Sequence, residues 1–414
     1  MALNLVCQVC GTTKLSSVVD LGFTPLVNTL PDIDSSILQD TVYDLALIQC
    51  KTCTLIQLRF APEMKDVFPE TYPYLSGLTT PLVQNFESQA KKVVSFMSKN
   101  IDEKHLKVLD IGSNDGSLLS RYKERGCLVY GIEPTQAADV ANLKGIKTSK
   151  AYFDSQSAEK LIEEFGKVSL VTATNVFAHI PEPLQILDNI LLVLNKDGIF
   201  VSENHYFPDL VTQLQIDTIY HEHLRYYTVT SIESLLEAKG LEIIHVEAIA
   251  SHGGSIRVWS ARKGVHKKDN SSFEFKSEEY SAGISDGAFI PFFQDSVLAW
   301  RNKLRVLITD LNTNGATIGG IGAPSRAVTL ISYLGLNHND LIGIGERTGS
   351  KKIGRRIPTT RIPIIDEKDL LEMQPTHLLI LSWHMGEFLM DNLRKSGFKG
   401  DFILPLPSPS IVKA

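Results

Sequence analysis

The residues of clearest chemical interest form one short run, Tyr220-His221-Glu222-His223. This spacing is not the His-Glu-x-x-His that places two imidazoles one helical turn apart for zinc, so it argues against a metal site. In an extended segment the two histidines would share a face, whereas in a helix Tyr220 and His223 would be neighbours. A structural role at a sheet edge is the alternative. The same residue types also suit an acid–base centre that removes a proton from carbon and holds the enolate oxygen.

Four of the five cysteines form two Cys-x-x-Cys pairs in the N-terminal segment. Each pair can hold one ion with two thiolates, and two pairs complete the tetrahedral sulfur set that zinc prefers. A redox pair or a chance spacing is the alternative. Four thiolates leave no position for water, so the zinc is expected to be structural and to staple a module over residues 1–72. The predicted ligands are Cys7, Cys10, Cys50 and Cys53, whereas Cys127 lies in an apolar stretch and is interpreted as a buried packing residue.

The element that would carry a cofactor begins with an apolar strand over residues 106–111. It ends in the turn GSNDGS, which does not match the dinucleotide fingerprint G-x-G-x-x-G. The glycines of this turn, Gly112 and Gly116, let the backbone approach a ligand closely. Asp110 before the turn, and Glu133 at the end of the following strand, can hold an amino group and a ribose diol.

This pattern resembles the class I methyltransferases that bind S-adenosylmethionine. The stretch VSLVTATNVFAHIPEPLQILDNILLVLNKDGIFVSE resembles the fourth and fifth strands of that fold, and the runs LEIIHVEAI and SIRVWSAR suit an antiparallel pair that closes the sheet. A methyltransferase domain over residues 73–262 is therefore expected, with a Rossmann-like domain for another nucleotide as the alternative. By this likeness the cofactor contacts are Asp110, Gly112, Asn114, Glu133, Phe153 and Asn175.

Residues 263–414 predict a second doubly wound α/β domain, because strand and helix patterns alternate after a charged linker and a helix. The stretch ATIGGIGAPSR reads as a strand, a glycine turn and a helix opened by Pro324, with backbone N–H groups aimed at an anion. A basic run follows, and it is either a solvated face or a set of charges that neutralises a bound diphosphate. Its members are Lys351, Lys352, Arg355, Arg356 and Arg361.

The ordered set of motifs, from the two cysteine pairs through VLDIGSNDGSLL, NVFAHIPEP, YHEH and HGGSIRVW to GIGAPSRAVTL, covers nearly the whole chain. It resembles the sugar-nucleotide C-methyltransferases that make branched deoxysugars from 4-keto hexoses. The resemblance implies methyl transfer from S-adenosylmethionine to C3 of a nucleotide-linked 4-keto hexose. It implies that His223 removes the C3 proton. Tyr220, His179 or Glu222 would hold the C4 oxygen and the sugar.

The resemblance also implies that the C-terminal domain holds the diphosphate of a nucleotide-sugar substrate. The chain departs from the family pattern at YPYLSGLTT, which contains Tyr74 and Ser76, at IGERTG with IPTTRIP, and at Trp383-His384. All three departures lie where the nucleotide sugar is expected, so the nucleotide and the sugar stay open. The implied substrate contacts are Tyr74, Ser325, Arg326, Lys352 and His384.

The bulk composition limits the remaining function classes. A chain of 414 residues with 43% hydrophobic and 21% charged residues is typical of a globular protein of two or three domains. The net charge of −6 gives no basic footprint for nucleic acid. No membrane span or signal peptide is recognised, so a cytoplasmic protein is expected, and we expect a monomer. A zinc-containing RNA or protein methyltransferase is the main alternative function.

Overall fold

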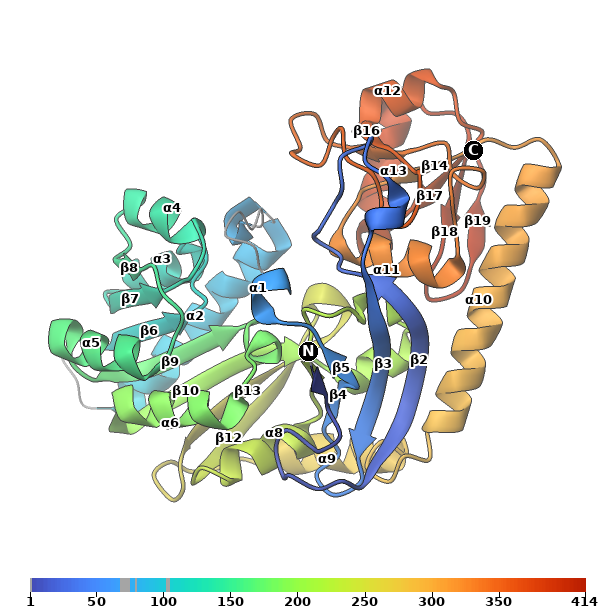
Figure 1. Cartoon of the computed structure of the whole chain (residues 1–414). Coiled ribbons are helices and arrows are strands. Elements are labelled where there is room, and N and C mark those ends of the chain that lie inside the picture. Colours follow the sequence, from blue (N-terminus) through green and yellow to red (C-terminus); the bar gives the residue numbers. More distant parts are fainter. Residues whose placement is uncertain (1, 68–74, 79, 102–104) are drawn as a thin grey trace.

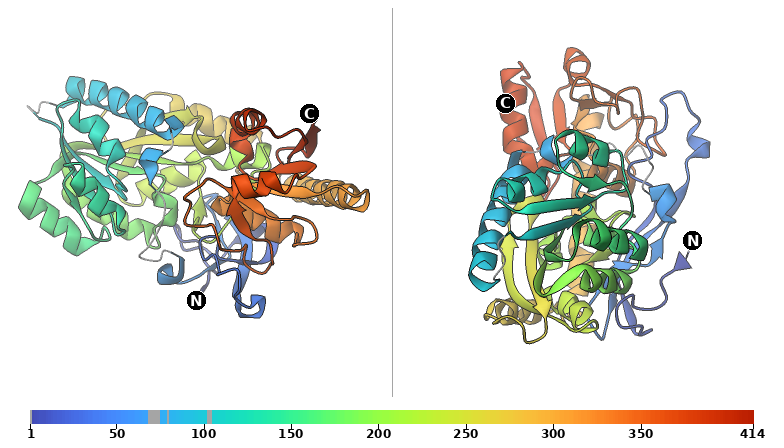
Figure 2. Two further views of the ribbon diagram at one scale, coloured as in Figure 1. Left: turned by 90° about the horizontal axis from the view of Figure 1, so that it is seen from above. Right: turned by 90° about the vertical axis from the view of Figure 1, so that its left-hand side faces the viewer.

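The structure, a computed structural model, describes residues 2–67, 75–78, 80–101 and 105–414. Two α/β regions lie side by side, and strands from the N-terminal segment run between them (Figures 1 and 2). Within the described residues, no helix is both long and apolar enough to cross a membrane.

The N-terminal region is a long antiparallel ribbon. Its sheet has the order β11-β4-β3-β2 and therefore includes a strand from far along the chain. That strand, β11, begins two residues after His223 and pairs with β4, which attaches the YHEH segment to the N-terminal sheet. The elements are β1 (Ala2–Leu3), β2 (Leu15–Pro25), β3 (Val42–Cys50), β4 (Ile56–Leu58), β5 (Phe60–Ala61), α1 (Met64–Val67) and β11 (Arg225–Tyr226).

The central region is a seven-stranded sheet of order β12-β13-β10-β9-β6-β7-β8. Its strands are parallel from β8 to β10, and β13 runs antiparallel to both β10 and β12. The antiparallel pairing of β12 with β13 is the one that the sequence predicted. Its strands are β6 (Lys107–Ile111), β7 (Leu128–Ile132), β8 (Thr148–Ser149), β9 (Val168–Thr174), β10 (Leu194–His205), β12 (Leu241–Ile249) and β13 (Ser255–Arg262). Its α-helices are α2 (Thr80–Asn100), α3 (Ser117–Lys123), α4 (Ala137–Leu143), α5 (Ser155–Phe165), α6 (Pro183–Val193), α7 (Phe207–Thr212) and α8 (Val229–Glu237).

The C-terminal region is a six-stranded sheet of order β16-β15-β14-β17-β18-β19, parallel except for β19. Buried residues of α10 and α11 pack with one face of this sheet, and those of α12 and α13 pack with the other, which confirms the doubly wound arrangement. The elements are α9 (Ser271–Ser281), α10 (Ile290–Thr313), β14 (Ile318–Ile321), α11 (Ser325–Leu334), β15 (Ile344–Glu346), β16 (Ile364–Asp366), α12 (Glu367–Glu372), β17 (His377–Ile380), α13 (Gly386–Lys395), β18 (Asp401–Leu404) and β19 (Ser410–Val412).

One hydrophobic core joins the three regions around the segment that precedes β11. It contains Leu47 of the ribbon, Ile219 of that segment and Leu330 of α11, all fully buried. The hydroxyl of Thr329 also donates to the carbonyl of Ile219 at 3.1 Å. Because apolar burial is the main stabilising term, this shared core fixes the YHEH segment against both neighbouring regions.

Candidate active site

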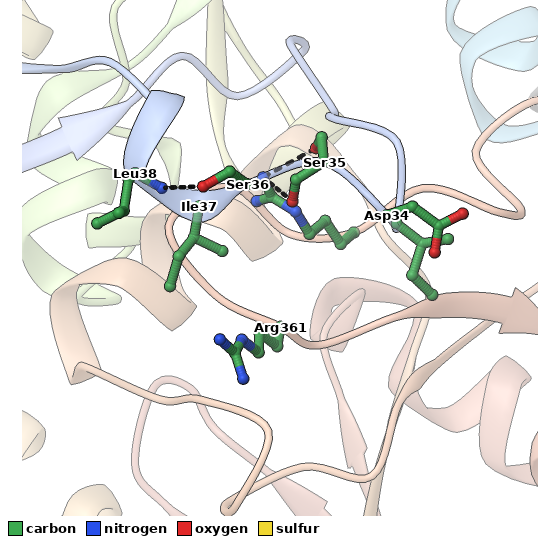
Figure 3. A pocket seen from close by; sticks show the side chains of 8 residues that line it. Asp34, Ser35, Ser36, Ile37, Leu38 and Arg361 are labelled. Atoms are coloured by element: carbon green, nitrogen blue, oxygen red, sulfur yellow. Dashed lines mark hydrogen bonds between the residues drawn. The ribbon is translucent and has the colours of Figure 1, made fainter.

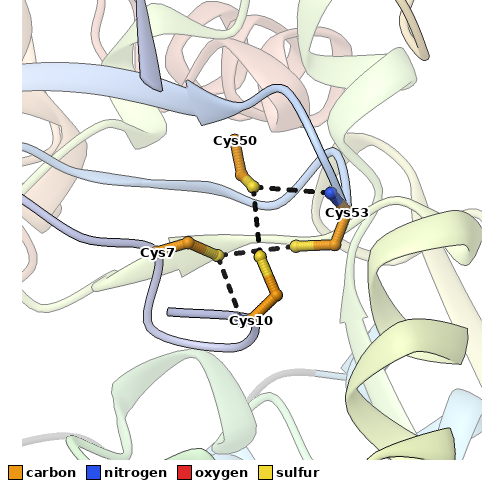
Figure 4. A group of neighbouring side chains, drawn as sticks. All are labelled: Cys7, Cys10, Cys50 and Cys53. Atoms are coloured by element: carbon orange, nitrogen blue, oxygen red, sulfur yellow. Dashed lines mark hydrogen bonds between the residues drawn. The ribbon is translucent and has the colours of Figure 1, made fainter. Parts of the chain in front are cut away.

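The four predicted zinc ligands come together beside the lower end of the ribbon (Figure 4). Their sulfur atoms all lie within 4.8 Å of one another, with Cys7 and Cys53 at 3.4 Å and Cys10 and Cys50 at 3.5 Å. Four thiolates at bonds of about 2.3 Å from a tetrahedral zinc would be separated by about 3.8 Å. The donor set therefore fits a structural zinc ion.

Both cysteine pairs have the same backbone turn. The N–H of Gly11 donates to the carbonyl of Cys7 at 2.9 Å, and that of Thr54 donates to Cys50 at 3.0 Å. Both residues adopt positive φ, +71° and +58°, a conformation that glycine adopts freely and threonine rarely. The two turns thus present their thiolates in the same way. Cys127 is buried elsewhere, as the sequence predicted.

The predicted cofactor turn lies at the carboxyl end of β6. Asp110 is almost fully buried, and Oδ1 accepts a hydrogen bond from the Thr172 hydroxyl at 2.7 Å. Burial raises the pKa of Asp110 to about 7. Gly112 has φ +67°, and a Cβ there would lie 2.5 Å from Val176. The turn can therefore take only glycine at this point without displacing its neighbours.

Glu133 directly follows β7 and lies beside the turn. Its two carboxylate oxygens accept the backbone N–H groups of Asn114 at 3.1 Å and Thr135 at 2.8 Å. Asn114 and Asn175 both adopt positive φ, so their backbones are held in an uncommon conformation at the same end of the sheet. Phe153 is buried in the core that also contains the end of β6. These placements bring the predicted cofactor residues to one edge of the sheet.

The YHEH segment forms a turn, because the His223 N–H donates to the carbonyl of Tyr220 at 3.0 Å. The two rings therefore lie against each other, tilted by 33°, with centroids 4.1 Å apart. His223 Nδ1 lies 2.8 Å from the carbonyl of Thr218, which can only accept, so Nδ1 carries the proton. Nε2 of the neutral ring is then the basic nitrogen.

Two further histidines complete a cluster of rings. His179, from the loop after β9, has its ring centroid 5.0 Å from that of His223, and its Nδ1 lies 2.6 Å from the carbonyl of Glu222. Burial lowers the pKa of His179, which favours the neutral ring. The ring centroid of His205, at the end of β10, lies 5.2 Å from that of His223. Sequence reasoning missed His205, although a histidine at the carboxyl end of a predicted parallel strand was an available signal.

His221 takes the structural part that the sequence suggested. Its Nε2 lies 3.1 Å from the carbonyl of Asp44, and its ring contacts Tyr43 in the ribbon. Burial lowers its pKa to about 4. His221 therefore faces the N-terminal module, whereas His223 faces the other rings.

An asparagine of the N-terminal module connects Glu222 to the C-terminal region. The amide nitrogen of Asn28 donates to Glu222 Oε1, and its oxygen accepts from the Ser325 hydroxyl at 3.0 Å. Ser325 is the first residue of α11. No sequence pattern indicates Asn28, because 194 positions separate it from Glu222. The structure thus joins one predicted catalytic residue to one predicted substrate residue.

Two other predicted substrate residues, Lys352 and Arg326, also lie near the start of α11. Lys352 Nζ donates to the carbonyl of Ala323 in the glycine turn. Arg326 Nη1 lies 3.9 Å from Oδ2 of Asp217, whose side chain is fully buried. The same oxygen accepts a hydrogen bond from Trp383 Nε1 at 2.8 Å. Burial raises the pKa of Asp217, and Arg326 opposes this shift. Asp217 is a second residue that sequence reasoning missed.

Tyr74 and His384 are the remaining predicted substrate residues. Tyr74 lies outside the described residues. His384 is exposed, and its neighbour Trp383 is the residue whose side chain reaches Asp217. The backbone N–H of Ser76 donates to the Asn114 side chain at 2.9 Å, which places Ser76 at the cofactor turn.

The residues of the basic run have different partners. Arg355 and Arg356 form ion pairs at 2.6 Å with Asp32 and Asp40 of the N-terminal module, so they tie that module to the C-terminal region. Arg361 lies across a pocket of about 550 Å³ from residues 35–38 (Figure 3). Lys351 is exposed, and Lys352 is the member that reaches the glycine turn.

The seven-stranded sheet, its acid-flanked glycine turn and the cysteine cluster define a class I methyltransferase with an N-terminal zinc-binding domain. Family models match three consecutive segments: a zinc binding domain at residues 7–68, a methyltransferase domain at 83–246 and a C-methyltransferase C-terminal domain at 250–407. The chain is 31% identical to the C-methyltransferase NovU of Streptomyces niveus over 413 residues, which cover 99% of this chain and 97% of that protein. The chain belongs to this C-methyltransferase family.

More distant likenesses concern part of the chain. The ubiquinone biosynthesis O-methyltransferase of Coxiella burnetii (strain RSA 331 / Henzerling II) is 20% identical over 171 residues, which cover 38% of this chain and 73% of that protein. Among solved structures, the plantazolicin methyltransferase BpumL in complex with SAH superposes with a TM-score of 0.37 at 14% identity, covering 45% of this chain and 87% of that one.

Proposed function

We propose that the protein transfers a methyl group from S-adenosylmethionine to C3 of a nucleotide-linked 4-keto hexose in branched-sugar biosynthesis. The observation that carries the proposal is the placement of His223. Its ring lies in a cluster with His179 and Tyr220, and the neighbouring Glu222 is linked through Asn28 to Ser325 at the start of α11. In this proposal His223 is the base for carbon, and it acts between the cofactor turn and the loop before α11.

In the proposed reaction Nε2 of His223 takes the C3 proton, because Nδ1 is committed to the Thr218 carbonyl. The C3–H electron pair moves toward the C4 oxygen, which Tyr220, His179 or Glu222 stabilises. S-adenosylmethionine supplies an electrophilic methyl group when bound. As the C3–CH₃ bond forms, the S–CH₃ bond breaks and the C4 carbonyl is restored. The proton on His223 is then released to solvent.

The cofactor would be held by the turn after β6. Asp110 would bind its amino group and Glu133 its ribose, while Gly112 lets the backbone approach it closely. Asn114, Asn175 and Phe153 would complete the contacts, with Phe153 near the adenine. Both acidic side chains are nearly buried at the same edge of the sheet, which suits a cationic ligand.

The nucleotide sugar would be held by the C-terminal region. The N-terminus of α11, which has 10 residues, offers backbone N–H groups to a diphosphate, and Ser325, Arg326 and Lys352 are the side chains beside it. Tyr74 and His384 stay predicted contacts of the sugar or nucleotide. The same proposal includes domains over residues 1–72, 73–262 and 263–414, a monomeric state and a cytoplasmic location. Light scattering after size exclusion tests the monomer.

The reaction can be tested with labelled S-adenosylmethionine and a panel of dTDP-, GDP- and CDP-linked 4-keto hexoses. We expect label in one of the sugars, with the new methyl group at C3 by NMR. Exchange of the C3 hydrogen with deuterated solvent, in the absence of the methyl donor, tests proton removal separately. Label in RNA or protein and in none of the sugars would contradict the proposal.

A further inference from the structure

The C-terminal region repeats the loop architecture of the cofactor turn. Gly112 and Gly322 each follow a buried parallel strand and have positive φ, +67° and +77°. Glu133 directly follows the neighbouring strand β7, and Glu346 is the last residue of the neighbouring strand β15. Each glutamate accepts a backbone N–H of the adjacent glycine turn, at 3.1 Å in the first case and 2.6 Å in the second. The chain therefore has two acidic side chains in equivalent positions beside two glycine turns.

Glu346 has an oxygen available for a ligand. Its Oε1 accepts the N–H of Ala323, and in the described part of the chain Oε2 has no hydrogen bond. In parallel α/β units, an acid about 20 residues after the glycine turn accepts hydrogen bonds from ribose hydroxyls. Glu346 follows Gly322 by a similar interval. A Cβ at Gly322 would lie 2.8 Å from the Ser382 hydroxyl, so the turn itself is as closely packed as the cofactor turn.

Lys352 relates Glu346 to the YHEH segment, because the carboxylates of both Glu346 and Glu222 act on its charge. Its ammonium group donates to the Ala323 carbonyl. Burial lowers the pKa of Lys352, while the nearby carboxylates of Glu346 and Glu222 oppose this shift. The cation is thus influenced both by the acid at the end of β15 and by the acid of the YHEH segment. A diphosphate at Lys352 would place its nucleoside toward one acid and its sugar toward the other.

A second unfilled acceptor lies at the first turn of α11. Asp217 is fully buried beside Arg326, and its Oδ1 has no hydrogen-bond partner among the described residues. A buried acceptor without a partner costs about 1–3 kcal/mol, so a donor from a ligand would be favourable here.

We infer that Glu346 binds the ribose 2′- and 3′-hydroxyls of the substrate nucleotide, so the substrate is a ribonucleoside-diphosphate sugar rather than a 2′-deoxyribonucleoside-diphosphate sugar. The inference rests on the proposed function and specifies its substrate class. With the ribose at Glu346, the diphosphate reaches Lys352 and the start of α11. The hexose then reaches Glu222 and the rings around His223.

The matched probes are 5-methyluridine diphosphate and thymidine diphosphate, which differ only by the 2′-hydroxyl. Calorimetry on the full-length protein measures their dissociation constants without requiring catalysis. We expect the ribonucleotide to bind about tenfold more tightly, the effect of one hydrogen bond to a charged group. Glu346→Gln keeps an acceptor for the Ala323 N–H and should lose most of this preference. Glu372→Gln, at an exposed glutamate at the end of α12, should retain it.

Equal binding of the two diphosphates, binding of neither, or a preference that survives in Glu346→Gln would overturn the inference. The 4-keto hexoses of the same two nucleotides separate it from the proposed reaction. If both sugars are methylated equally well, the inference fails and the reaction stands. If the ribonucleotide is preferred in binding but no sugar is ever methylated, the proposed reaction fails and ribose recognition stands.

Discussion

The turns after β6 and β14 share one backbone plan, and the proposed function assigns to them two ligands of opposite charge. Both have a glycine with positive φ and a glutamate at the end of the next strand. They differ two residues before the glycine, where the first strand has Asp110 and the second has Gly320. Asp110 is a buried acid suited to an amino group, whereas the space beside Gly320 is filled by the apolar side chains of Ile344 and Leu381 and holds no acid.

The side chains around the two turns extend the same contrast. Asp115 follows the first turn and pairs with Lys144, so the cofactor edge carries three acids within a short stretch of fold. Arg326 and Lys352 lie at the second turn. S-adenosylmethionine is a cation and a diphosphate is an anion, so the local charge, rather than the fold, separates the two ligands.

The largest expected effect comes from the residue between the turns. His223→Asn should reduce methyl transfer by about 10³-fold, because it removes the general base. Binding of S-adenosylmethionine and of the nucleotide should persist in calorimetry, since both turns are intact. His221→Asn is the matched control, because an asparagine amide can still donate to the Asp44 carbonyl. Normal C3 deuterium exchange in His223→Asn would assign the base elsewhere.

Alanine at each turn glycine should affect one ligand only. Gly112→Ala would bring a methyl group within 2.5 Å of Val176, and Gly322→Ala would bring one within 2.8 Å of Ser382. Both positions also have positive φ, which alanine adopts only with strain. We expect Gly112→Ala to weaken S-adenosylmethionine binding by about tenfold or more and Gly322→Ala to weaken nucleoside diphosphate binding similarly. Loss of both ligands in either variant, with an unchanged circular dichroism spectrum, would break the comparison.

The link between the YHEH segment and the start of α11 can be weakened at Asn28. Asn28→Ala removes the hydrogen bonds to Glu222 and Ser325, so turnover should fall by about tenfold. Ser36→Ala is the control within the same module, because that side chain is exposed and accepts from the Leu38 N–H rather than contacting Glu222 or Ser325. Steady-state kinetics with saturating S-adenosylmethionine measure the effect. Turnover equal to the control would make Asn28 a packing residue.

The smallest effect is a difference in pH dependence. Burial raises the pKa of Asp110 to about 7, so this carboxyl is neutral below that pH and ionised above it. The affinity for the cationic cofactor should therefore fall severalfold between pH 7.5 and 6, as Asp110 takes up a proton. Asp110→Asn should bind more weakly throughout and show a flatter profile. Calorimetry across this range tests it, and an unchanged wild-type affinity would contradict the assignment of Asp110.

The sequence was sufficient where the determining residues are close together along the chain. Each pair of zinc ligands follows from one local turn, and the glycine turn after β6 follows from a strand and two nearby residues. The YHEH segment is local as well. Its hydrogen bond from His223 to the Tyr220 carbonyl closes a turn, so Tyr220 and His223 became neighbours, as the helical alternative implied. The extended alternative, with both histidines on one face, was wrong.

The basic run shows the opposite limit. Its residue types alone could not distinguish a diphosphate-binding site from a structural one, because the partners of Arg355 and Arg356 lie in the N-terminal module. Likewise, Trp383 rather than His384 reaches Asp217, a difference of one position that depends on the short helical turn after β17. Side-chain direction at such a turn is set by packing against a neighbouring region.

By itself the sequence determined the cysteine cluster, the two α/β sheets and the residue types of the YHEH segment. These features depend on local spacing and on hydrophobic periodicity, which are written along the chain. Only the tertiary structure decided that β11 joins the N-terminal sheet, that Asn28 lies between Glu222 and Ser325, and that His205 faces His223. These contacts join segments that are far apart in the sequence, and only the shared hydrophobic core brings them within bonding distance.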